Sequence, residues 1–261
     1  MLLVLVTAAL AGTGAVLYVL PGWAATRFPM EGSAFAVMTV GSWFLGGAFL
    51  TWYVVRDGRW AAMYPGIVFL GAFAALEGAV LVLHTDDVRT TFLTWIYAAA
   101  LLVALLVALV AGVEGLRARG SREPIGRPVP AWVRVMTVLF LAFDLYIAIS
   151  LFLGTTDGGR IWPGSLPLPM GRAFGAFYLA LGLAVAPALF AKRDGPVMWL
   201  MPGGMVGAIL ILVPAFVYLE LFDFEAEPGG LIYLGTFLVI LVVEAVILSV
   251  SRRAGLSPEA G

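Results

Sequence analysis

The chain has 261 residues, of which 62% are hydrophobic and 12% are charged, and its formal net charge is −1. A soluble domain has about 45–50% apolar and about 25% charged residues, so this composition excludes an ordinary water-soluble globule. The near-neutral charge argues against a nucleic-acid partner, which usually requires a basic surface. The sequence contains no cysteine, which excludes disulfides, thiolate metal sites and iron–sulfur clusters.

Eight apolar runs follow one another along the chain, and each is close to the roughly 20 residues that cross ~30 Å of hydrocarbon. In lipid every backbone polar group must be satisfied internally, so the runs predict helices. The predicted membrane helices are 2–20, 34–55, 61–83, 92–113, 132–154, 172–191, 197–221 and 231–250. The first run lacks the basic start and the clear cleavage site of a signal peptide, so we expect a retained helix.

One part of the sequence occurs twice. GSAF at 32–35, RDG at 56–58 and YPG at 64–66 are matched by GRAF at 171–174, RDG at 193–195 and MPG at 201–203. The repeat predicts an all-α transmembrane bundle of eight helices, arranged as two parallel four-helix repeats. The repeats would cover 1–117 and 132–253, with a cytoplasmic Gly-, Pro- and Arg-rich linker at 118–131 and a disordered tail at 254–261.

Basic residues are distributed unevenly between the two sets of loops. One set holds Arg56, Arg59, Arg117, Arg119, Arg122, Arg127, Arg134, Lys192, Arg193, Arg252 and Arg253, and the other holds Arg27, Arg89, Arg160 and Arg172. Short cytoplasmic loops carry an excess of Lys and Arg. The pattern therefore predicts a multi-pass plasma-membrane protein with both termini in the cytoplasm.

Three acids fall well inside predicted membrane helices: Glu77, Asp144 and Glu244. A charged side chain at a helix centre costs about 2.5–3.5 kcal/mol on insertion scales, so each is a functional candidate. No Lys or Arg lies at comparable depth, which leaves two interpretations open. The acids are neutral and hydrogen-bonded to nearby groups, or they bind and relay protons or cations. Glu220, at the outer end of the seventh run, is a further candidate.

His84 is the only histidine and follows Glu77 by seven positions, which places both on one helix face about 10.5 Å apart. Beside Asp86 and Asp87 it is a candidate proton entry point or outer metal contact. The alternative is an amphipathic residue exposed at a helix end. The acids do not follow the repeat, because Glu77 aligns with Pro214, so any function of the acids would arise from divergence of the halves.

Three segments carry a resemblance to a known family: Phe28-Pro29, LVLH followed by TTFLTWIYA at 81–98, and IWPGSLPLPMGRAFGAF at 161–177. They resemble a family of uncharacterised polytopic membrane proteins of high-GC Gram-positive bacteria. The family pattern has WPW followed by PLT-x-R; here Trp162-Pro163 is followed by Gly164, and Arg172 is present without the threonine. The resemblance implies a membrane fold and assigns no activity or site residue.

The leading hypothesis is an integral membrane protein that acts in proton- or cation-linked transport. The alternative is a non-catalytic membrane subunit or scaffold of a larger complex, and a weaker one is a lipid-modifying enzyme with Asp86, Asp87, Arg89, Asp157 and Arg160 as its polar groups. Expected partners are the lipid bilayer and either a second copy or a membrane complex. No metal site or cofactor is predicted; bis-histidine haem, for example, requires two histidines.

Overall fold

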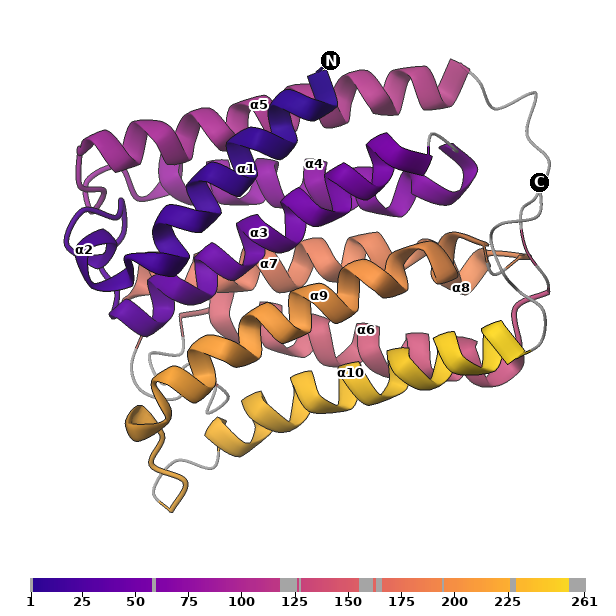
Figure 1. Ribbon diagram of the computed structural model, residues 1–261. Helices are drawn as coiled ribbons and strands as arrows, with labels where there is room; N and C mark the ends of the chain where they lie inside the picture. The colour runs from indigo at the N-terminus through magenta and orange to yellow at the C-terminus, as the bar shows by residue number, and fades with distance from the viewer. Residues whose placement is uncertain are drawn as a thin grey trace.

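The computed structural model describes residues 2–57, 60–117, 126, 128–154, 162, 166–193, 195–225 and 229–253. Regular structure in these residues is helical, apart from one isolated bridge between Pro128 and Arg193. The elements are α1 (Leu2–Val19), α2 (Pro21–Ala25), α3 (Ala34–Asp57), α4 (Trp60–Leu83), α5 (Phe92–Arg117), α6 (Ala131–Phe152), α7 (Leu168–Val185), α8 (Pro187–Phe190), α9 (Gly195–Val217), η3 (Leu219–Leu221) and α10 (Gly229–Arg253). The axes of the long helices are roughly aligned, with the chain reversing direction between consecutive long helices, and together they form a bundle (Figure 1).

Seven of the described helices are long and apolar enough to cross a membrane, and α1 contributes a shorter apolar helix over Leu3–Val19. The predicted all-helical, multi-pass membrane architecture is therefore confirmed, with helix boundaries close to those of the apolar runs. Pro187 separates α7 from α8 within the sixth run, because proline cannot donate the backbone hydrogen bond that would continue α7. Most of the predicted linker (118–125 and 127) and the whole predicted tail (254–261) lie outside the described residues.

The interior of the bundle is formed mainly by α3 and α7, whose side chains over 35–48 and 170–184 are largely buried. Within the first half of the chain α1 packs on α3 and α4 packs on α5. Within the second half α6 packs on α7 and α9 packs on α10. Across the halves α3 packs on α9, α4 packs on α7, and α4 also touches α9. In Figure 1, α1 and α5 lie along one edge of the bundle and α6 and α10 along the opposite edge.

Glycines set the closest helix crossings. A Cβ added at Gly41 of α3 would lie 2.8 Å from the backbone nitrogen of Tyr18 in α1, and one at Gly14 would lie 3.0 Å from the carbonyl oxygen of Gly41. At the α3–α9 crossing a Cβ on Gly46 would lie 3.6 Å from the Cα of Gly207. Helices in lipid associate through close backbone contact rather than the hydrophobic effect, so these positions require small residues.

Pro214 lies inside α9, where its missing N–H leaves the carbonyl of Leu210 without its usual helical partner. Two hydroxyl groups from the first half of the chain supply the missing donors. The Leu210 carbonyl oxygen lies 2.8 Å from Ser42 Oγ and 3.1 Å from the Tyr18 hydroxyl. Neighbouring helices commonly re-satisfy such groups at membrane depth. The same two hydrogen bonds therefore join α1 and α3 to α9.

Candidate functional site

Glu77 is fully buried in α4 at its interface with α5. The hydroxyl of Tyr97, itself fully buried in α5, donates to Glu77 Oε2 at 2.8 Å. The ring of Tyr97 packs edge-on against Phe28, with centroids 5.1 Å apart, and is tilted against Phe44. Glu77 is thus held by a tyrosine through Oε2, as the hydrogen-bonded interpretation of the acids predicts, while its Oε1 has no hydrogen-bond partner among the described residues.

Asp144 lies in α6 and is 2% exposed. It faces α7 at Gly182, where an added Cβ would lie 3.8 Å from the Asp144 Cβ. Tyr178, one turn earlier in α7, lies within electrostatic range of the Asp144 carboxyl group. One oxygen of Asp144, Oδ2, has no hydrogen-bond partner among the described residues. Asp144 is therefore enclosed between two helices and separate from the Glu77 site.

Glu244 lies in α10 and its carboxyl group occupies the space left by the missing side chain of Gly204 in α9. A Cβ added at Gly204 would lie only 2.0 Å from Glu244 Oε1 and 2.8 Å from its Cδ. The residue is 9% exposed, and Oε2 has no hydrogen-bond partner in the described part of the chain. Unlike the other two acids, Glu244 lines a large cavity.

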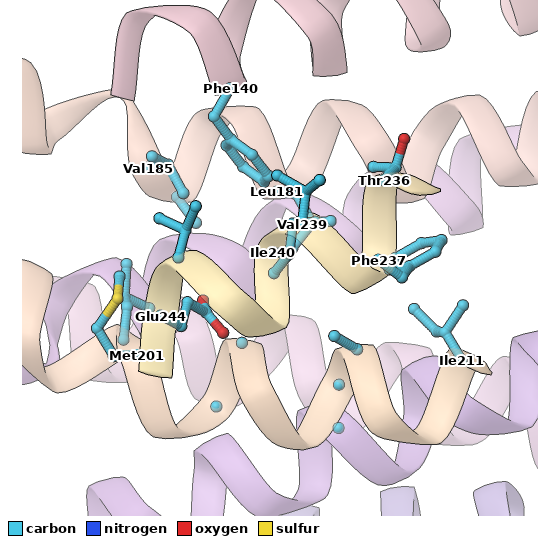
Figure 2. A pocket seen from close by; sticks show the side chains of 18 of the residues that line it. Phe140, Leu181, Val185, Met201, Ile211, Thr236, Phe237, Val239, Ile240 and Glu244 are labelled. Atoms are coloured by element: carbon cyan, nitrogen blue, oxygen red, sulfur yellow. The ribbon is translucent and has the colours of Figure 1, made fainter. Parts of the chain in front are cut away.

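This cavity, of about 590 Å³, lies between α6 and α10 and extends inward to α3, α7 and α9. It is lined largely by apolar side chains, among them Phe140, Leu181, Val185 and Met201 (Figure 2). Its rim includes Leu139 of α6, which is 57% exposed, and Val239 of α10, which is 61% exposed. Both residues lie in the middle of membrane-length helices, so this part of the rim lies on the side of the bundle, at the depth of the lipid.

Glu244 is the only ionisable side chain among the described residues that line the cavity. The other side chains in this set with hydrogen-bonding groups are Ser42, Thr137, Thr236 and Trp43, and the three hydroxyl protons are donated to backbone carbonyls. Thr137 donates to the carbonyl of Val133 at 2.8 Å, and Thr236 donates to that of Ile232 at 2.7 Å. The Ser42 hydroxyl lies within hydrogen-bond distance of the carbonyl oxygens of Met38 and Leu210. The Glu244 carboxyl group is therefore the one group among the described lining residues that can offer a negative charge to a ligand.

His84 is buried, with 7% exposure, so the expectation of an exposed residue at a helix end is wrong. Its Nε2 lies 2.9 Å from Nη1 of Arg172 in α7. A guanidinium group only donates, so Nε2 is the acceptor and the ring proton is assigned to Nδ1, which lies 3.3 Å from Asp87 Oδ2. His84 thus joins the end of α4 to α7, and this explains its burial without a metal or a proton pathway.

Among the remaining candidates, Glu220 lies exposed in η3. Arg89 donates to the carbonyl of Ala25 at 3.1 Å and so stabilises the turn around α2. Asp157 and Arg160 lie outside the described residues. The structure therefore does not bring the sequence-predicted acids into one site. Glu77, Asp144 and Glu244 lie at three different helix interfaces, and of the three only Glu244 lines the cavity.

Sequence reasoning did not identify Tyr97, Gly204 or Arg172 as partners of these groups. Tyr97 could have been found, because Glu77 and Tyr97 are each ten residues from Asp87 in the connection between α4 and α5. Antiparallel neighbours at equal distance from a turn lie at similar depth. Contacts between distant segments, such as His84 with Arg172, give no comparable sequence signal.

Comparison of the chain with protein-family models, characterised proteins and solved structures finds no match. The site is therefore interpreted from its own chemistry. A carboxyl group in an apolar cavity can accept and release a proton, or it can form an ion pair with a cation that enters the cavity. Among the described residues that line the cavity there is no His, Cys, Asp, Lys or Arg beside Glu244.

Proposed function

We propose that this protein is a membrane transporter in which Glu244 is the proton- or cation-exchanging group. The observation that carries the proposal is the position of this carboxyl group. It is buried at membrane depth, has no basic partner in the described residues, and lines a cavity of about 590 Å³ that reaches the lipid-facing surface. Ionisable residues inside a membrane are rare and commonly mark substrate or ion pathways.

The two interpretations of the acids apply to different residues. Glu77 is enclosed and bonded to Tyr97, which favours a neutral, structural carboxyl group. Asp144 is enclosed as well, although it lacks a described hydrogen-bond partner for Oδ2. Of the three acids, Glu244 is the one that lines the described cavity. The exchange role is therefore assigned to Glu244, and Glu77 serves as the control residue in the experiments below.

The duplication of a four-helix unit is part of the proposal, and the pattern of helix contacts is the observation that supports it. Exchanging α1, α3, α4 and α5 with α6, α7, α9 and α10 maps the main helix contacts onto one another, as two parallel repeats require. Two contacts have no comparable counterpart, α3 with α4 and α1 with α5; the helices that correspond to α1 and α5 are α6 and α10, and both line the cavity. The cavity thus lies where the two repeats differ, and the acid at its wall, Glu244, belongs to only one of them.

The membrane orientation is proposed from the distribution of charge. Arg56, Arg117 and Arg193 lie at the end of the bundle where α3 ends, α5 ends and α9 begins, and Arg27, Arg89 and Arg172 lie at the opposite end. The positive-inside rule places the first of these ends in the cytoplasm. Both termini would then be cytoplasmic in a plasma-membrane protein, and Glu244 would lie in the cytoplasmic half of α10.

The alternatives find less support. Small-residue faces motivate the scaffold hypothesis, but Gly14, Gly41, Gly46 and Gly175 already form close contacts inside the bundle. A lipid-modifying site in the outer loops would require free polar groups, whereas Asp87 contacts His84 and Arg89 is bonded to a backbone carbonyl.

The proposal is tested by flux into proteoliposomes that contain the purified protein and a luminal pH- or cation-sensitive dye. Gradients of H⁺, Na⁺ and K⁺ are imposed in turn. We expect the wild type to dissipate at least one gradient faster than protein-free liposomes, and Glu244→Gln to reduce this rate to the protein-free value. The substitution removes the exchangeable charge and keeps the side-chain shape.

Glu77→Gln is the matched control, since an amide oxygen still accepts the Tyr97 hydrogen bond. It is expected to retain most of the wild-type rate. Equal rates for the wild type and Glu244→Gln would refute the assignment to Glu244. A wild-type rate no greater than that of protein-free liposomes for every gradient would refute ion-linked transport itself.

A further inference from the structure

The cavity at Glu244 has two chemical properties that together limit its ligand. The first is a wall of apolar and aromatic side chains, the aromatic ones being Trp43, Phe69, Phe140, Phe143, Phe177 and Phe237. The second is a single carboxyl group whose Oε2 lacks a partner among the described residues. Pockets for small organic molecules are typically about 300–1,000 Å³ and are apolar with few polar groups, and this cavity of about 590 Å³ falls within that range.

Three ligand classes can be compared against these properties. An organic anion would meet the Glu244 carboxylate, and no Lys or Arg is among the described lining residues to compensate for the repulsion. A neutral acyl chain would fill the apolar space but leave the buried carboxyl oxygen unpaired, which is costly. A hard metal ion such as Ca²⁺ takes about six to eight oxygen ligands, whereas the described lining residues offer one carboxylate and three hydroxyl groups.

We infer that the cavity binds a lipophilic organic cation, whose positive centre pairs with Glu244 and whose apolar body contacts the aromatic wall. Such a ligand satisfies both properties at once, and aromatic faces also attract cations directly. The inference rests on the proposed function, because it names the substrate class of the same Glu244 site. Binding of the cation is measured separately from transport, so each can be tested without the other.

The position of the opening indicates how the ligand enters. Leu139 and Val239 line the cavity and are exposed in the middle of α6 and α10. A lipophilic cation concentrates in the bilayer and reaches this opening from the lipid. Glycines keep the interior open: a Cβ added at Gly207 of α9 or Gly235 of α10, both lining residues, would meet no atom within 4 Å.

Equilibrium binding of radiolabelled tetraphenylphosphonium tests the inference. The purified full-length protein is placed in phosphatidylcholine nanodiscs, and binding to empty nanodiscs is subtracted. We expect saturable binding, and no saturable binding of tetraphenylborate, which has nearly the same shape and the opposite charge. Glu244→Gln should weaken tetraphenylphosphonium binding at least about tenfold, since a charge pair at ~4 Å is much stronger in a partly buried site than in water.

Two further variants separate a lost site from a lost fold. Gly207→Leu should also weaken binding, because its side chain would occupy the cavity while Glu244 remains. Glu77→Gln should bind as the wild type does, because Glu77 does not line the cavity. Equal binding of the two probe ions, unchanged binding by Glu244→Gln, or loss of binding in Glu77→Gln would each overturn the inference. Saturable binding without flux would refute the transport proposal alone, and flux without binding would refute the ligand class alone.

Discussion

Gly41→Leu is expected to destabilise the protein by about 3 kcal/mol, because the new side chain would collide with the backbone of α1. A Cβ at position 41 would lie 2.8 Å from the Tyr18 nitrogen and 3.1 Å from the Gly14 carbonyl oxygen. Backbone atoms cannot rotate away as a side chain does, so α1 and α3 must separate. The midpoint of thermal unfolding in mild detergent should fall by roughly 5–10 °C.

Gly12→Leu is the matched control for this prediction. Gly12 lies in α1, the helix against which Gly41 packs, and an added Cβ at Gly12 meets no atom within 4 Å. The substitution is therefore expected to leave the unfolding midpoint close to that of the wild type. Equal midpoints for the Gly41 and Gly12 variants would show that α1 does not pack on α3 at this crossing.

Gly204→Ala is expected to act on the site rather than on the fold. Its Cβ would lie 2.0 Å from Glu244 Oε1, which forces the carboxyl group out of its position. The displaced atoms are the far end of a flexible side chain, so the unfolding midpoint should change little. Tetraphenylphosphonium binding should weaken about tenfold, which corresponds to ~1.4 kcal/mol. The measurement is binding and thermal unfolding on the same preparation.

Gly78→Ala provides the comparison, because Gly78 also adjoins a buried acid, Glu77, and an added Cβ there meets no atom within 4 Å. It should change neither binding nor stability. If Gly204→Ala bound the probe as tightly as the wild type does, the placement of the Glu244 carboxyl group against α9 would be wrong. If its unfolding midpoint fell as far as that of Gly41→Leu, the effect on binding would be one of folding.

The sequence predicts the helices well because the constraint behind them is simple. A chain that crosses lipid must satisfy its backbone internally, so long apolar runs such as 34–55 and 61–83 become α3 and α4 with nearly the same boundaries. Proline at position 187 ends α7 because it has no backbone N–H to donate. The Gly46 and Gly207 contact between α3 and α9 likewise follows the rule that small residues permit close packing.

The site is less predictable from the sequence. The free-energy cost of placing a carboxyl group inside a membrane marks Glu77, Asp144 and Glu244 equally, and it says nothing of what surrounds each of them. The three acids differ in their tertiary surroundings. Tyr97 donates a hydrogen bond to Glu77, α7 packs against Asp144, and Glu244 lines the cavity. The cavity is lined by residues of α3, α4, α6, α7, α9 and α10, so it depends on the packing of the whole bundle.

The most direct test of the central claim, that Glu244 is the membrane-accessible acid, is labelling with dicyclohexylcarbodiimide. This apolar reagent enters membranes and adds to a carboxyl group, giving a stable acylurea that mass spectrometry locates. The protein in phosphatidylcholine nanodiscs is treated for increasing times, and the modified fraction at each acid is measured. We predict that Glu244 is modified while Glu77 and Asp144, enclosed in the bundle, stay largely unmodified. Modification of Glu77 or Asp144 at the same rate as Glu244 or faster would contradict the account.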